Sequence, residues 1–162
     1  MTVSSGFPIK VAIVQALRDG AGLVAAIAAA HESGAAGKWL HEGFGPEKTP
    51  YPFVTYQQVY GPYAYTWGSV MLRAGFDVKV YSENSVEANN LFALVAAELD
   101  EAELPVAGQS TLICRRAADL GSPDTDEEGK KIYMVGATYE VWTDQPLPRR
   151  ITGSFTAAAV IA

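Results

Sequence analysis

The sequence predicts an α+β fold, with a mainly antiparallel sheet of four to five strands, helices packed on one face and an extended C-terminal tail. Every second residue from Val70 to Val80 is apolar, and a period of two indicates a strand with one buried face. From Val86 to Leu104 the apolar residues recur at helical spacing, which predicts a long helix folded onto that strand. The whole chain reads as helices, two strands, a helix and two strands, an order typical of antiparallel hairpins with the helices on one face.

Two helices are predicted in the N-terminal region. Pro8 suits the first turn of a helix, because its missing N–H costs nothing there. Gly20 predicts the end of this helix, as a left-handed cap. A second helix from Ala21 to about Glu32 is so rich in alanine that we expect it to pack closely on another element. The first helix carries one apolar stripe: Ile9, Ile13, Val14 and Leu17.

The middle of the chain predicts a loop and the first strands. Ser33–Pro50 is rich in glycine and proline, which predicts a loop with at most a short strand around Lys38–His41. Tyr51-Pro52 opens a strand that continues from Phe53 to Tyr60. Gly61–Gly68 is expected to turn the chain into the central strand.

The central strand is expected to have a wet face opposite its apolar one, because Arg73, Asp77 and Lys79 alternate with the apolar residues. Ser82–Ser85 ends the strand. Ser85 is predicted to be the N-cap of the following helix, since its hydroxyl can accept a hydrogen bond from a free backbone N–H of the first turn.

The C-terminal half predicts two further strands and a tail. The long helix is expected to end near Leu104-Pro105. Three segments follow: a strand from Ser110 to Ala118, an acidic loop from Asp119 to Gly129, and a last strand from Lys131 to Asp144. No repeat or long linker divides the chain, so residues 1–150 are expected to form a single domain and residues 151–162 an apolar C-terminal extension.

Composition narrows the class of protein. The 162 residues are 49% hydrophobic and 19% charged, which is typical of one soluble globular domain. The formal net charge of -6 argues against a general nucleic-acid binder, which needs a basic face. Lys10 and Arg18 precede an apolar run that imitates a signal peptide, but Arg18-Asp19-Gly20 interrupts it, so we interpret the region as helices of a cytosolic protein without a membrane span.

No motif for catalysis, a cofactor or a metal is found. The chain has neither a glycine-rich phosphate loop nor a nucleophile elbow. Asp124–Gly129 starts like a calcium loop, but Val135 stands at the twelfth position, where that motif needs glutamate. His31 and His41 lie ten residues apart without a third ligand nearby. Cys114 lies in an apolar run and is expected to be a buried hydrophobe rather than a nucleophile.

Aromatic residues gather before and within the turn into the central strand: Tyr56, Tyr60, Tyr63, Tyr65 and Trp67. One interpretation is that they cap the core. The other is that they anchor a protein interface, where aromatic residues dominate the binding energy. The apolar tail Phe155–Ala162 points the same way, because it could form a strand at a sheet edge of its own or a neighbouring chain.

The layout as a whole resembles a known family. The relevant segments are the helix pair Ile9–Leu17 and Leu23–Ile27, the strand Tyr51-Pro52-Phe53-Val54, the strand Phe76–Ser82, the following helix with Glu87-Ala88 and Leu91, and the strand Tyr139-Glu140-Val141-Trp142. Over Ile9 to Asp144 the chain resembles the tail terminator (tail completion) proteins of long-tailed bacteriophages and related gene transfer agents. It departs from them in the extension Ile151–Ala162 and the long loop Ser33–Pro50.

The resemblance implies a structural virion protein without catalytic residues or cofactors. Such proteins form homohexameric rings on the last ring of the tail tube, stop its polymerisation and offer a surface to the head-tail connector or stopper protein. The implied place is the neck region of the virion tail, after assembly in the host cytoplasm. DNA would pass through the ring without specific binding.

Two sets of site residues follow as hypotheses. The interface set comprises Tyr63, Tyr65, Trp67, Arg73, Asp77, Lys79 and Phe155. The second set is an acidic hairpin that could reach the central channel of a ring, where negative charge repels phosphate: Asp124, Asp126, Glu127 and Glu128.

Three alternatives remain at this stage. The first is another neck or head-tail connector component. The second is a small ligand-binding or enzymatic α+β domain with a pocket between sheet and helix near Tyr56, Tyr65 and Cys114. The third is an RNA-binding sheet that uses exposed tyrosines, which the acidic balance disfavours.

Overall fold

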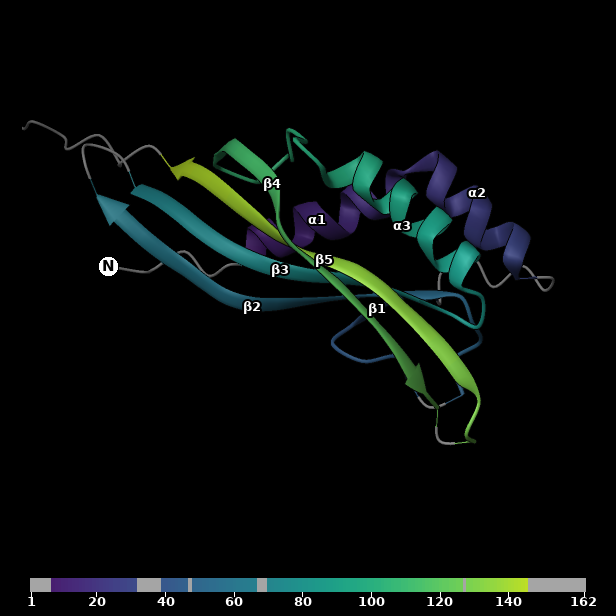
Figure 1. Ribbon diagram of the computed structural model, residues 1–162. Helices are drawn as coiled ribbons and strands as arrows, with labels where there is room; N and C mark the ends of the chain where they lie inside the picture. Colours follow the sequence, from purple (N-terminus) through teal and green to yellow (C-terminus); the bar gives the residue numbers. More distant parts are fainter. Residues whose placement is uncertain (1–6, 32–38, 47, 67–69, 127, 146–162) are drawn as a thin grey trace, which may run out of the picture.

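The computed structural model describes residues 7–31, 39–46, 48–66, 70–126 and 128–145 (Figure 1). The elements are α1 (Phe7–Asp19), α2 (Ala21–Ala30), β1 (Leu40–Glu42), β2 (Phe53–Thr66), β3 (Val70–Ser82), α3 (Ser85–Leu99), β4 (Ser110–Thr125) and β5 (Lys131–Gln145). The strands form one sheet in the order β1-β2-β3-β5-β4. β1 pairs parallel to β2, and the other three pairings are antiparallel. The helices lie together on one side of the twisted sheet, so the predicted α+β fold is confirmed.

The predicted central strand is the middle of the sheet. β3 pairs with β5 from Val70–Gln145 to Ser82–Tyr133 without a register shift. Its apolar face is buried as the period of two predicts: Leu72, Ala74, Phe76, Val78 and Val80 are at most 1% exposed. The last four of these belong to one core cluster with buried residues of the three helices, and this core forms between the two layers.

The helix after the central strand begins and ends differently from the prediction. Asn84, not Ser85, is the N-cap: its side-chain Oδ1 accepts hydrogen bonds from the N–H groups of Val86 (2.8 Å) and Glu87 (3.4 Å). α3 ends at Leu99 rather than near Leu104. Beyond it the backbone N–H of Glu101, a residue with φ of 58°, donates to the carbonyl of Cys114 (2.8 Å), which directs the chain along β4 and away from the helix axis.

Gly20 is not the left-handed cap that the sequence predicted. Its φ is -63°, and it stands as the N-cap of α2. A Cβ at this position would lie 2.8 Å from the Glu98 side chain of α3. Gly20 therefore matters because it allows α3 to approach the junction of α1 and α2.

Two strands run further than local residue preferences indicate. β2 continues through the predicted turn at Gly61–Gly68 as far as Thr66, and β4 continues through the first part of the predicted acidic loop to Thr125. Each contains two register shifts. In β2 the second shift encloses Gly61 and Pro62, which are accommodated as a bulge. In β4 the shifts lie before Ala118, and Gly121 and Pro123 pair in register with Val135 and Tyr133.

Candidate functional site

Three features were sought among the described residues: a metal-binding group, a membrane-spanning helix and a reactive thiol. Among them, no group of three or more His, Cys, Asp or Glu side chains could hold a metal ion. No single described helix is long and apolar enough to cross a membrane; α1 and α2 together meet that test of length and composition, but the chain bends by 65° between them. Cys114 is 2% exposed, and burial, with a smaller effect of Asp100, raises the pKa of its thiol to about 12, the opposite of what a nucleophile needs.

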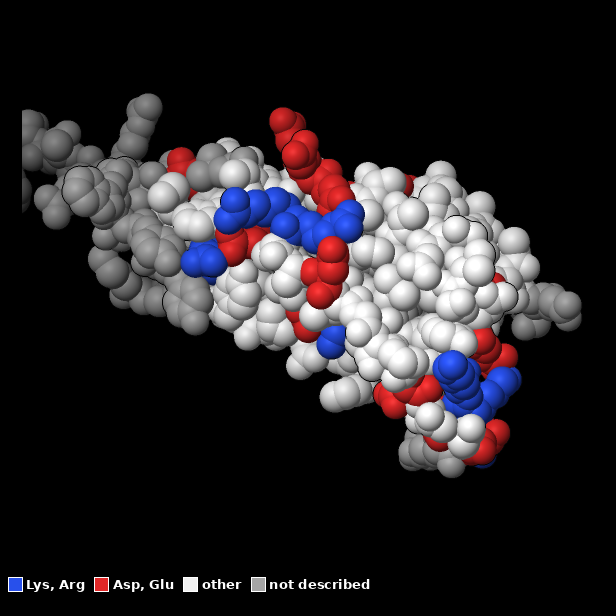
Figure 2. Space-filling model, in the orientation of Figure 1, with Lys and Arg blue, Asp and Glu red and all other residues white. Residues whose placement is uncertain are grey.

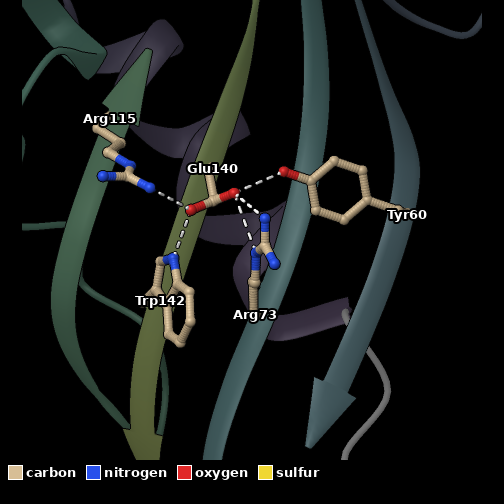
Figure 3. A network of polar contacts seen from close by, with 5 residues as sticks. All are labelled: Tyr60, Arg73, Arg115, Glu140 and Trp142. Carbon is tan, nitrogen blue, oxygen red and sulfur yellow. Dashed lines mark hydrogen bonds and ion pairs between the residues drawn. The ribbon is translucent and has the colours of Figure 1, made fainter. Parts of the chain in front are cut away.

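The most structured polar site lies on the face of the sheet opposite the helices. Glu140 on β5 accepts hydrogen bonds from side chains on all four long strands (Figure 3). Its Oε2 accepts from Tyr60 Oη (3.0 Å) and from Arg73 Nε (3.0 Å) and Nη2 (2.5 Å). Its Oε1 accepts from Arg115 Nη2 (3.0 Å) and Trp142 Nε1 (2.6 Å). We call these five residues the Glu140 cluster.

Glu140 is only 2% exposed, although no described helix covers this face of the sheet. Burial alone would raise the pKa of its carboxyl group, but the hydrogen bonds from Trp142, Arg73, Tyr60 and Arg115 outweigh it and lower the pKa to about 2. The carboxylate is therefore ionised and has every lone pair in use. Such a group is suited to fixing strands in position, and not to proton transfer near neutral pH.

A glycine on the central strand makes room for this cluster. Gly75 pairs with Tyr60 on one side and with Glu140 on the other. A Cβ at Gly75 would lie 2.2 Å from the Tyr60 ring, so the ring occupies the space that a side chain would fill. The Arg73 guanidinium lies over the rings of Tyr60 and Trp142, at 5.5 and 5.3 Å from their centroids. The cluster is thus packed as well as hydrogen-bonded.

The three predicted interface residues of β3 lie on this face and make contacts within the subunit. Arg73 belongs to the Glu140 cluster. Asp77 accepts a hydrogen bond from Thr138 Oγ1 (2.7 Å) and pairs with Lys79 Nζ (3.3 Å). Their side chains are 35%, 15% and 25% exposed, so all three retain accessible surface. Contact with a neighbouring subunit stays a prediction.

The other predicted interface residues are placed in part or not at all. Tyr63 and Tyr65 lie on β2, where their backbones pair with Arg73 and Met71. Their side chains, and the whole of Trp67 and Phe155, lie outside the described residues.

The predicted acidic hairpin is the tip between β4 and β5, and its charge is mixed. Asp126 closes the turn, since its Oδ1 accepts from the N–H groups of Glu128 (3.1 Å) and Lys130 (2.7 Å). Lys130 also pairs with Glu83. Figure 2 shows acidic and basic side chains together at this end of the molecule. Asp124 and Glu128 are exposed, and Glu127 lies outside the described residues.

Sequence reasoning missed the centre of the site. Arg115 was not predicted as a site residue, yet it lies within β4 and pairs with Glu140, while its neighbour Arg116 pairs with Asp100 and Asp119. The sequence did contain one signal for this site. Glu140 stands within the apolar run Tyr139–Trp142, between two residues, Tyr139 and Val141, that lie in the core. A charge there needs partners on adjacent strands, and sequence alone does not say which.

Comparisons with known proteins identify the family of the chain. The family profile described as tail completion protein gp17 matches residues 11–144. A search of curated protein sequences found no significant match. A solved chain from the virion of a native gene transfer agent particle is 13% identical, with a TM-score of 0.61 over 84% of this chain and 94% of that one. A second solved chain is 15% identical, with a TM-score of 0.53 over 90% and 99% of the two chains.

Proposed function

Since this chain belongs to the tail completion protein gp17 family, we propose that it assembles as a homohexameric ring that caps the tail tube of a phage-like particle. In this proposal the ring stops polymerisation of the tube and joins it to the head connector. The protein acts as a structural component of the virion neck and catalyses no reaction.

The family match carries this proposal, because residues 11–144 extend from within α1 to the penultimate residue of β5 and so include nearly all of the described elements. The likeness to a chain of a gene transfer agent virion supports the fold. The Glu140 cluster adds a physical argument. It joins β2, β3, β5 and β4 through one saturated carboxylate, which suits a rigid building block better than a site that must exchange protons or ligands.

The partners in this proposal are further copies of the chain, the tail tube protein and a connector or stopper protein. DNA passes through the ring without specific binding. The tip between β4 and β5 is proposed to reach the channel, with Asp124, Asp126 and Glu128 facing the DNA. The lysines beside them reduce the repulsion that the acidic residues alone would exert.

The test combines mass and tube assembly. Light scattering of the purified chain should give six times the monomer mass, and electron micrographs should show rings. Added to growing tail tubes, the protein should stop elongation and be found at one end. A chain that remains monomeric both in solution and on tubes would overturn the proposal. Rings that bind tube ends while elongation continues would favour a connector component instead.

A further inference from the structure

A groove of about 690 Å³ lies between the loop before β2 and the hairpin tip between β4 and β5. We call it the tip groove. At its base are Phe53 and Ile132, whose exposed fractions are 8% and 7%, and Tyr51 stacks on Phe53 with ring centroids 5.2 Å apart. The loop rests directly on this base, because a Cβ at Gly45 would lie 2.8 Å from the Phe53 ring. The tip groove is thus an apolar hollow with room for several side chains.

The rim of the tip groove carries more negative than positive charge. Its lining includes three carboxylates and two lysines: Glu83, Asp126, Glu128, Lys48 and Lys130. Burial, and then the charges of Asp126 and Glu83, raise the pKa of Tyr51, so the field at the groove is negative although Lys130 opposes it. The tip groove therefore favours a segment that brings positive charge to the rim and an apolar side chain to the base.

The chain carries such a segment soon after β5. Arg149 and Arg150 are adjacent, and Ile151 follows them; all three lie outside the described residues. Within one copy this segment cannot reach the tip groove. β5 runs from Lys131, beside the tip, to Gln145, and its 14 steps of ~3.3 Å place the two ends about 45 Å apart. The six residues from Gln145 to Ile151 span at most ~22 Å when fully extended.

We propose that Arg149, Arg150 and Ile151 of one copy dock in the tip groove of the next copy. This inference rests on the proposed ring and names one contact that joins its subunits. A ring needs two different surfaces of the same chain to meet, and the segment after β5 and the tip groove belong to opposite ends of that strand. The arginines face Asp126 and Glu128, because a guanidinium binds a carboxylate through two parallel N–H groups, and Ile151 covers the apolar base.

This contact has a consequence for the arrangement of the ring. The end of β5 in one copy lies beside the hairpin tip of the next, so the strands run around the ring more than along its axis. The tip then lies between the next copy and the channel. Asp124 does not line the tip groove and keeps its charge towards the DNA, whereas the arginines of the next copy neutralise part of the charge of Asp126 and Glu128.

Cysteine cross-linking between different copies tests the contact. One full-length chain carries Thr125→Cys, at the tip groove, and another carries Ile151→Cys; the two are mixed, assembled and oxidised. A disulfide between the two chains should form in severalfold greater yield than with Val86→Cys in place of Thr125→Cys. Val86 on α3 is the matched control, because it is 64% exposed and does not line the groove. Native Cys114 is buried in the core and does not compete.

Charge reversal gives an independent test. Arg150→Glu should raise the protein concentration needed to form rings by about tenfold, because it places a carboxylate against Asp126 and Glu128. Glu128→Lys in the same chain should restore assembly, because it exchanges the charges across the contact. Arg18→Glu, in the exposed last turn of α1, makes the same change of charge away from the groove and should leave assembly unchanged.

The outcomes separate this contact from the ring itself. Rings of hexameric mass that give no more cross-link than the Val86→Cys control would overturn this inference and leave the proposed ring intact. Equal assembly of Arg150→Glu and Arg18→Glu would do the same. A disulfide that forms only within one chain carrying both Thr125→Cys and Ile151→Cys would also overturn it, because the segment would then reach its own groove. A monomeric mass for the native sequence would overturn the proposed ring and this contact with it.

Discussion

Two regions of the same sheet hold their charged side chains in opposite ways. In the Glu140 cluster one carboxylate, whose side chain is 3% exposed, receives five hydrogen bonds from side chains on the three other long strands and on its own strand. At the tip between β4 and β5, Lys130 and Glu83 form an ion pair while 54% and 44% exposed. Both regions contain ion pairs, but only in the Glu140 cluster is one of the charges, the carboxylate, removed from water.

The difference teaches where electrostatics contributes to this fold. A buried charge must be matched by its neighbours, and loss of either side leaves the other without compensation. An exposed pair exchanges one solvated arrangement for another, and its contribution is small. The stability of the fold should therefore be sensitive to substitutions in the Glu140 cluster and tolerant of substitutions at the hairpin tip.

Removing the central carboxylate should have the largest effect. Glu140→Gln keeps the size of the side chain but leaves Arg73 and Arg115 facing a neutral group. We expect a loss of about 2–4 kcal/mol in the free energy of unfolding, somewhat less than for a fully buried pair because both arginines are partly exposed. Urea denaturation measures this. Glu128→Gln at the exposed tip is the matched control and should leave the unfolding curve unchanged; equal effects of the two substitutions would contradict the comparison.

Acid should weaken the same region in a defined pH window. The pKa of Glu140 is lowered from 4.5 to about 2 in the folded protein. A lowered pKa stabilises the fold above the unfolded value, and that contribution is lost as the pH falls from about 4.5 towards 2. The difference in stability between the native sequence and Glu140→Gln should therefore shrink over this window. A difference that stays constant down to pH 2 would show that folding does not lower the pKa of Glu140.

Filling the space under Tyr60 should have the next largest effect. In Gly75→Ala the new methyl group would meet the Tyr60 ring, so the ring must move and its hydrogen bond to Glu140 is strained. We expect a loss of about 1–3 kcal/mol, as for other overpacked sites. Gly121→Ala on β4 is the control, because the nearest atom to its Cβ is a carbonyl oxygen at 3.9 Å. Thermal unfolding of both variants should separate them by several degrees.

The same contrast explains what sequence could predict. The alternation along Val70–Val80 and the helical spacing after it depend on burial over many residues, and both were confirmed. Strand ends at Tyr60 and Ala118 were wrong because proline, glycine and charge were read as breakers, whereas pairing with an adjacent strand carried the chain past them. Asn84 was overlooked as a cap because Ser85, one residue on, is an equally good cap by residue type.

The site was less predictable than the fold for a physical reason. Arg73 was identified from its place on the polar face of β3, a local property. Its partner Glu140 lies 67 residues away, and the pairing depends on the register between β3 and β5. That register is a tertiary property, set by which faces are buried and by the turn lengths. Residues such as Tyr60 and Arg115 join the cluster only once all four strands are aligned.

The smallest effect is expected at the hairpin tip, and it is the sharpest check of the comparison. Lys130→Ala removes the pair with Glu83, but both groups remain solvated, and the turn itself is closed by backbone N–H groups that donate to Asp126. The unfolding midpoint should stay within experimental error of the native value, and any residual difference should vanish at high salt, where exposed charges are screened. Asp126→Ala, which removes the side chain that closes the turn, should lower the midpoint measurably. If Lys130→Ala were the more damaging of the two, the tip would owe its order to the ion pair, and the contrast with the Glu140 cluster would fail.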